Sequence, residues 1–269
     1  MIQSKKIIKV AFILILLGSA FRYFLFDTPL RIFFWNEENM KPLLNLIGIQ
    51  WEDYANNTLV DKTIVIIGKT IASFLLICGL YIAIKDKINQ SIIYILTFIF
   101  LLFAILTWKD NFYHLPFLLE QSVFCFTGII YLKNQENKSL VLFTKIIIAL
   151  TFIGHGLYAL NIYNIPGEFV QLTMNATGYE EEKSKHFLKL FGFFDLIFSF
   201  LLFSSKQKWV NIGLIYCVLW GFLTAFSRIV GHYHEELGIH SLDEYWHECI
   251  IRIPNGLVPL FLYVKSKKG

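Results

Sequence analysis

Charged residues are scarce in this sequence. Only 16% of its 269 residues are Asp, Glu, Lys or Arg, whereas an ordinary soluble domain has roughly 25%. Hydrophobic residues make up 56% of the chain. This balance excludes an ordinary soluble domain and indicates a membrane protein. The net charge of +4 does not indicate a nucleic-acid partner, because the lysines lie between apolar segments, where membrane topology accounts for them.

Cysteine is also rare. The four cysteines include no CxxC or other close pair, and all lie in or beside apolar segments: Cys78, Cys125, Cys217 and Cys249. We therefore expect buried small hydrophobic side chains and no disulfide framework.

The sequence lacks the common motifs of soluble catalysis and nucleotide binding. It has no GxGxxG, no P-loop, no nucleophile elbow and no HExxH, and no low-complexity linker. Its N-terminus begins with basic residues and an apolar core, as a signal peptide does. No small-x-small cleavage site precedes a mature domain, so we expect a retained first helix.

What the sequence does contain is a series of long apolar segments. At about 20 apolar residues per span, the candidates are residues 7–26, 63–84, 91–108, 114–132, 140–163, 185–205, 209–230 and 247–265. The sequence therefore predicts an all-α polytopic membrane protein with eight transmembrane helices. Residues 27–62 are expected to form an interfacial amphipathic segment anchored by Trp35 and Trp51.

The connections between these segments alternate in charge. One set is basic, for example at Lys85 and Lys206, and the other is acidic or histidine-rich, for example at Glu52 and Glu180. Cytoplasmic loops carry an excess of Lys and Arg. The pattern thus predicts a multi-pass protein of the cell inner membrane with both termini in the cytoplasm.

The two halves of the sequence resemble each other. The tetrapeptide SFLL occurs once in each half, and the spacing from Glu120 to Gly128 equals that from Glu248 to Gly256. We interpret this as an internal duplication into two parallel four-helix repeats related by an axis along the membrane normal. The first four-helix membrane half would comprise residues 1–134 and the second residues 135–269.

The run FIGHGLYAL, followed by PGEFVQL, an acidic stretch and FLKLFGFFDLIFSFLL, resembles the first half of a DoxX-like membrane protein. The resemblance is best over residues 152–202, and its matching positions are Gly154, Gly156, Pro166, Gly192 and Asp195. Lys69 departs from it, because an acidic residue is expected there in the first half. The resemblance implies a helical bundle that is associated in some relatives with quinone-linked or thiol-linked redox systems.

Polar residues within or near the outer ends of the spans are the candidate ligand-binding residues. They are Arg22, Lys69, Glu120, His155, Asp195, Arg228, Glu248 and Arg252. Intramembrane charges usually face the bundle interior and pair with one another. These residues therefore either form a pocket open to the outside or only lock the bundle. We expect Asp195 to pair with His155 or with a cation of the spans, and Arg228 to meet Glu248 and Arg252.

Histidine allows further interpretations. His155, between two glycines, suits a hydrogen-bond donor to a quinone, a proton relay or a structural hydrogen bond. Haem is disfavoured, because no second span histidine lies at a matching depth. His232, His234 and His247 are candidate metal ligands, but an HxH pair on a helix points its rings apart, so metal is not our main interpretation.

Three classes of function remain open. The leading one is a DoxX-like membrane component that binds a quinone or another small ligand, or serves a membrane redox system with a membrane protein as partner. The second is a transporter of a small anionic solute that uses Arg22, Lys69, Arg228 and Arg252. The third is a structural or assembly subunit without catalysis. The sequence assigns no reaction and no cargo.

Overall fold

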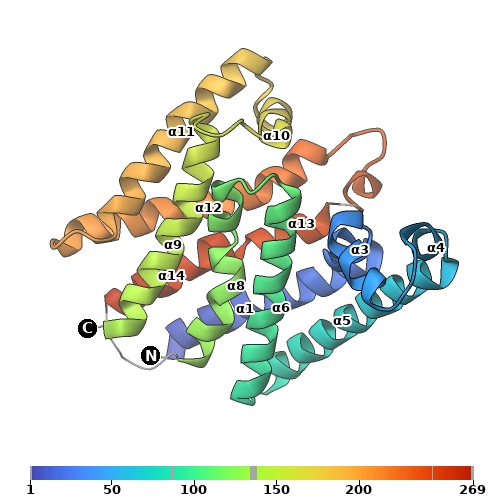
Figure 1. The fold of residues 1–269 in the computed structure, drawn as a ribbon. Coiled ribbons are helices and arrows are strands. Elements are labelled where there is room, and N and C mark those ends of the chain that lie inside the picture. Colours follow the sequence, from blue (N-terminus) through green and yellow to red (C-terminus); the bar gives the residue numbers. More distant parts are fainter. Residues whose placement is uncertain (1, 86–87, 134–137, 244, 268–269) are drawn as a thin grey trace.

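Every element in the described part of the chain is helical. The computed structural model describes residues 2–85, 88–133, 138–243 and 245–267 (Figure 1). The elements are α1 (Ile2–Leu25), α2 (Leu30–Phe34), α3 (Glu37–Leu46), α4 (Trp51–Ala55), α5 (Thr58–Ile84), α6 (Gln90–Asp110), α7 (Leu115–Glu120), α8 (Ser122–Leu132), α9 (Lys138–Ala159), α10 (Gly167–Thr177), α11 (Glu181–Leu201), α12 (Gln207–His232), the 3₁₀ helix η1 (Ile239–Leu242), α13 (Trp246–Arg252) and α14 (Pro254–Ser266).

Asparagine side chains mark where two of the long helices begin. Asn57 accepts a hydrogen bond of 2.9 Å from the Leu59 amide at the start of α5, and Asn89 accepts one of 2.9 Å from the Ser91 amide at the start of α6. The first amides of a helix have no partner within the helix, so such caps stabilise its first turn by about 1 kcal/mol each.

Six helices are long and apolar enough to cross a membrane: Gln3–Leu25, Thr58–Ile84, Gln90–Asp110, Leu115–Leu132, Lys138–Ala159 and Gln207–His232. The prediction of an all-helical, multi-pass membrane protein is therefore confirmed. The expected spans at 185–205 and 247–265 are helical but are not among these six.

The two remaining segments differ from the others for identifiable reasons. The first turns of α11 carry Glu181, Glu182 and several lysines, which raises the cost of placing the whole helix in hydrocarbon. The last segment is two shorter helices, α13 and α14, with Pro254 opening the second. Proline has no amide hydrogen and cannot continue the hydrogen-bond ladder of the preceding turn.

Large apolar side chains are exposed on the outer faces of the long helices. Ile66 and Ile77 of α5 are 64% and 65% exposed, and Leu219 and Leu223 of α12 are 60% and 61% exposed. A monomer in water rarely leaves so much apolar surface uncovered. Lipid is the solvent that suits such helices, since all backbone hydrogen bonds are satisfied inside each helix.

The helices of the first half and of the second half pack in matching pairs. Helix α1 packs on α5, and α9 packs on α11. Helix α6 packs on α8, and α12 packs on α14. Between the halves, α1 contacts α13 and α14, while α9 contacts α7 and α8, and α8 meets α14.

Glycines allow the closest of these contacts. A Cβ added to Gly154 of α9 would lie 2.7 Å from the Pro116 carbonyl oxygen at α7, and one added to Gly221 of α12 would lie 2.6 Å from the backbone of Asn255 in α14. Side chains larger than hydrogen would therefore push these helices apart. Gly154 thus allows the close contact of α9 with α7, and Gly221 that of α12 with α14.

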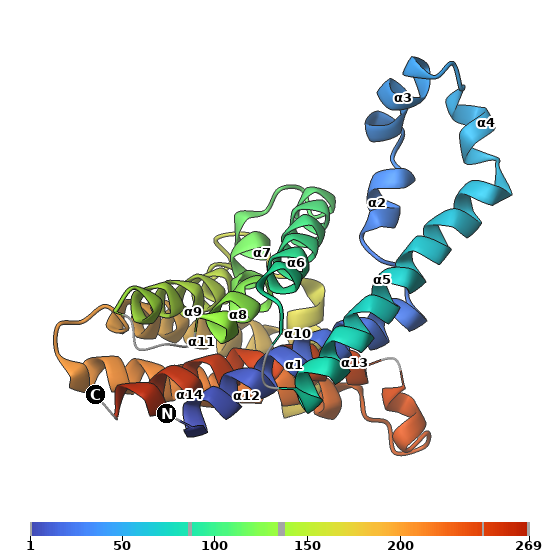
Figure 2. The same ribbon diagram turned by 90° about the horizontal axis from the view of Figure 1, so that it is seen from below.

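Both chain termini lie close together at one end of the bundle in both views (Figures 1 and 2). Helices α2, α3 and α4 project at the far end, next to the start of α5 (Figure 2). This segment is held by Arg31, whose guanidinium lies 2.7 Å from Asp61 and 2.6 Å from Asp27. The side chains of Trp35 and Trp51 both pack near Tyr54.

Candidate functional site

The cavity that carries the most sequence-predicted residues lies among α9, α10, α11 and α12. Its volume is about 270 Å³. Most of its wall is apolar and aromatic: Phe169, Leu172, Phe187, Leu188, Phe191 and Trp220. Three of the predicted polar residues, His155, Asp195 and Arg228, also line it. An apolar cavity with a few convergent polar groups is the usual form of a small-molecule site.

A pair of glycines brings α9 and α11 together at this cavity. A Cβ on Gly156 would lie 2.9 Å from the Gly192 carbonyl oxygen and 3.3 Å from Cβ of Asp195. Gly154, on the other side of His155, faces α7. Gly154 therefore allows close approach by α7, and Gly156 allows close approach by α11. His155 lies between these two glycines in α9.

Arg228 is the buried cation of the cavity wall. It is only 4% exposed, and its Nη1 donates a hydrogen bond of 2.6 Å to the Thr224 carbonyl oxygen. Its Nε lies 3.6 Å from Glu248 Oε2, which is too long for a hydrogen bond. The Nε group accordingly has no hydrogen-bond partner in the described residues. A buried donor without a partner costs about 1 to 3 kcal/mol, and more when it is charged.

Glu120 and His155 form a second buried contact. Glu120 ends α7, and its Oε1 lies 3.0 Å from Nδ1 of His155 in α9. The distance fits a hydrogen bond but the angle does not, since Oε1 has no partner of good geometry. We therefore describe the contact as electrostatic. The positive charges of Arg228 and Arg252 also act on the Glu120 carboxylate.

Arg228, Glu248 and Arg252 lie in one charged cluster, as their positions along the chain predict. Arg228 interacts electrostatically with Arg252, Glu248 and Glu120, and Glu248 belongs to α13 together with Arg252. The cluster thus joins the ends of α12 and α13 to the end of α7. Its two arginines and two glutamates balance each other, which offsets part of the cost of burial.

Asp195 has a different partner from the one expected. It is 1% exposed, and Tyr216 of α12 donates a hydrogen bond of 2.8 Å to its Oδ1. The Trp220 side chain is a second hydrogen-bond partner. We expected His155 or a cation of the spans. Tyr216 and Trp220 are one turn apart on α12, which packs directly on α11, so these two side chains reach the carboxylate first.

Two of the predicted site residues lie outside this site. Arg22 and Lys69 are exposed. Lys69 lines a separate hollow of about 390 Å³ between the end of α1 and α5, together with Asp27 and Gly68. Helix α1 packs on α13, where the Arg22 charge acts on His247, whereas Lys69 of α5 lines the separate hollow.

The three histidines considered as metal ligands do not come together. His232 stacks on Tyr245, with ring centroids 3.5 Å apart, and His247 packs beside Phe26 at 5.2 Å. His234 is exposed after the end of α12. In the described part of the chain, no group of three or more His, Cys, Asp or Glu side chains has the geometry to hold a metal ion.

Sequence reasoning missed the aromatic wall and the two hydrogen-bond partners of Asp195. Tyr216 and Trp220 recur at helical spacing in an apolar span, and each carries one polar atom. Aromatic side chains of this kind usually find a hydrogen-bond partner when buried. That spacing was the available signal, although it does not identify Asp195 as the hydrogen-bond partner.

No family model, curated protein or solved structure matches this chain. The DoxX-like resemblance therefore rests only on the residues quoted for it above.

Proposed function

We propose that this protein is a DoxX-like membrane protein that binds a small lipophilic ligand with an oxygen acceptor, such as a quinone, in the cavity among α9, α10, α11 and α12. One observation carries the proposal. The Arg228 guanidinium is buried in an otherwise mostly apolar wall, and its Nε has no hydrogen-bond partner in the described residues.

The apolar part of the cavity wall favours the hydrophobic body of such a ligand, and the polar part favours its oxygen acceptor. The aromatic side chains favour a flat or hydrophobic body, because burying apolar surface is favourable by roughly 25 cal/mol per Å². A carbonyl or anionic oxygen that accepts a hydrogen bond from the Arg228 guanidinium would form a charge-assisted contact in this mostly apolar surrounding. His155, on α9, offers a second polar contact in the same cavity.

The proposal includes eight transmembrane segments arranged as two parallel four-helix repeats in the cell inner membrane, with both termini in the cytoplasm. The matched packing of α1 with α5 and of α9 with α11 supports the repeat, as does that of α6 with α8 and of α12 with α14. The charge alternation of the connections supports the orientation. The seventh and eighth segments beyond the six long ones are α11 and the broken pair α13 and α14.

A transporter of a small anionic solute is the second candidate. It is favoured by the two interrupted helices, α7–α8 and α13–α14, which break beside Glu120 and Arg252. Transporters often build their sites from such discontinuous helices. Of the four cations expected for this function, two belong to the charged cluster, Arg228 and Arg252. A structural or assembly role, in which the charges only pair, is the third candidate.

Ligand retention tests the proposal. The protein is purified in a neutral detergent, its co-extracted small molecules are identified by mass spectrometry, and a short-chain quinone is then titrated calorimetrically. Arg228→Ala should lower quinone affinity by at least about tenfold, the loss typical of a hydrogen bond to a charged group. Lys69→Gln, which removes an exposed cation elsewhere, should bind as the unchanged protein does.

A second variant separates binding from folding. Arg228→Ala leaves the partly exposed Glu248 without this cation, which should lower stability. Arg228→Ala combined with Glu248→Gln removes both charges and should regain stability without regaining affinity. The ligand proposal is refuted if the double variant is stable and binds the quinone normally, or if the unchanged protein binds none. Binding of a small anion in its place would support the transporter.

A further inference from the structure

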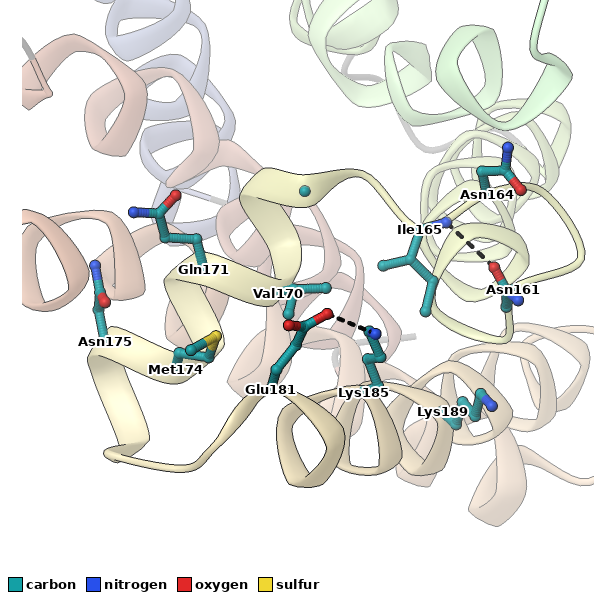
Figure 3. A pocket seen from close by; sticks show the side chains of 11 residues that line it. Asn161, Asn164, Ile165, Val170, Gln171, Met174, Asn175, Glu181, Lys185 and Lys189 are labelled. Carbon is teal, nitrogen blue, oxygen red and sulfur yellow. Dashed lines mark hydrogen bonds and ion pairs between the residues drawn. The ribbon is translucent and has the colours of Figure 1, made fainter.

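A polar groove lies on the opposite face of α10 from the cavity. It has a volume of about 600 Å³ and is bounded by the α9–α10 connection, α10 and α11. Carboxamides line both ends of it, Gln171 and Asn175 at one end and Asn161 and Asn164 at the other, and charged side chains of α11 lie between them (Figure 3). Helix α10 divides the two sites, because Gln171 and Asn175 face the groove while Leu172 and Ala176 face the cavity.

The charges of the groove are not fully compensated. Lys185 is held by two carboxylates, with Nζ 2.6 Å from Glu181 and 3.0 Å from Glu182. Lys189 lies one turn further along α11 and also lines the groove, but it forms no ion pair with any described residue. The Lys189 charge acts on Glu182 at a distance, and Asn175 already donates a hydrogen bond of 2.8 Å to the Gly231 carbonyl oxygen. Lys189 therefore offers a positive charge that is not in an ion pair, in a groove where the other carboxamides can donate hydrogen bonds.

An exposed apolar stripe continues from Lys189 along the same face of α11. Phe193, Ile197 and Phe200 follow it at helical spacing and are 54%, 38% and 68% exposed. Lys189 lines the groove and also stands at the N-terminal end of this stripe. The helix thus changes from charged to apolar at Lys189, as a helix does where it enters a bilayer.

We propose that the groove and the stripe together bind one membrane lipid with an anionic, phosphate-bearing headgroup. The phosphate pairs with Lys189 and accepts hydrogen bonds from the carboxamides of the groove, and an acyl chain lies along Phe193, Ile197 and Phe200. A cation beside a lipid phosphate and an apolar strip beside its chain match the two halves of a phospholipid. This site is separate from the cavity and does not depend on the ligand proposed for it.

The test compares two lysines of one helix. Full-length protein in neutral detergent is titrated with phosphatidylglycerol and with phosphatidylcholine of the same chains, and bound lipid is counted by native mass spectrometry. Lys189→Gln should weaken phosphatidylglycerol binding about fivefold, the effect of one lysine at a membrane surface. Lys183→Gln, at an exposed position of α11 outside the groove, should leave binding unchanged.

Two further measurements separate the headgroup from the chain. Phe193→Ala should weaken the binding of phosphatidylglycerol, while the titration with inorganic phosphate should show binding that is far weaker than that of the lipid. The proposal is overturned if phosphatidylcholine binds as well as phosphatidylglycerol, or if Lys183→Gln and Lys189→Gln have equal effects. Inorganic phosphate that binds as tightly as the lipid would make this a free-anion site and would also overturn it.

Discussion

Nδ1 of His155 lies 3.0 Å from Oε1 of Glu120, and the two side chains come from helices on opposite sides of the chain midpoint, α9 and α7. The contact is buried and lies at the end of α7, where Gln121 separates that helix from α8. Gly154, one residue before the histidine, lets α7 approach closely enough for it to form. The contact therefore joins the two halves of the protein at a polar point inside a mostly apolar bundle.

Removing either member of this pair should destabilise the protein. His155→Ala or Glu120→Ala alone should cost about 3 kcal/mol or more, because each removes the electrostatic partner of a buried polar group. The double variant should cost less than the sum of the two, since it removes both groups together. Thermal unfolding in detergent measures all three. Additive losses would show that the two side chains do not interact.

Close helix packing predicts a strong effect of an added methyl group at Gly221. Its Cβ would lie 2.6 Å from the backbone of Asn255, so Gly221→Ala should lower the free energy of unfolding by about 1 to 3 kcal/mol. Gly167→Ala is the matched control, because a Cβ there meets nothing within 4 Å. Thermal unfolding of the two variants side by side checks the prediction, and equal melting temperatures would contradict the packing of α12 on α14.

The hydroxyl of Tyr216 should matter more than its ring. Tyr216→Phe keeps the aromatic packing but removes the donor to Asp195, and it should cost about 1 to 3 kcal/mol. Tyr94→Phe, at a residue that is 48% exposed, should change stability by less than about 0.5 kcal/mol. Chemical or thermal unfolding of both variants decides the point. A neutral Tyr216→Phe would mean that Asp195 has another sufficient partner.

Cysteine labelling tests the predicted orientation. The four native cysteines are free and buried, so they should react slowly with a membrane-impermeant maleimide. Cysteines placed at Glu180 or Glu235 should be labelled from outside in intact cells, because acidic connections are expected on that side. Those at Lys133 or Lys206 should be labelled only after the membrane is opened. Labelling of position 133 in intact cells would exclude the eight-span topology.

Local sequence features predicted the helical segments well. Each of the eight predicted segments coincides with a helix or a pair of adjoining helices, because the length of an apolar run and the residues that end it are local properties. Helix α11, predicted as a span, is not among the six helices that are long and apolar enough to cross a membrane. The second half of α11 is apolar, but the charged residues of its first turns lower the hydrophobicity of the helix as a whole.

The sequence also predicted that Arg228 would meet Glu248 and Arg252. Arg228 lies near the end of one segment, and Glu248 and Arg252 lie at the start of the next. The connection between the two segments therefore brings the three residues to the same side of the bundle. It could not predict that Arg22 and Lys69 would be exposed. Their exposure depends on how α1 and α5 pack against each other and against the rest of the bundle, which no local pattern specifies.

By itself the sequence determined that this chain is an all-helical membrane protein, and it identified the ionisable residues His155, Asp195 and Arg228 that the bundle buries. Those conclusions follow from the high cost of unpaired charge and unpaired backbone in hydrocarbon, which acts on each segment separately. Only the tertiary structure decided that Tyr216 pairs with Asp195, that Glu120 contacts His155, and that side chains from four helices line one cavity. Those pairings depend on which helix faces meet, and that choice is made by the packing of side chains far apart in the chain.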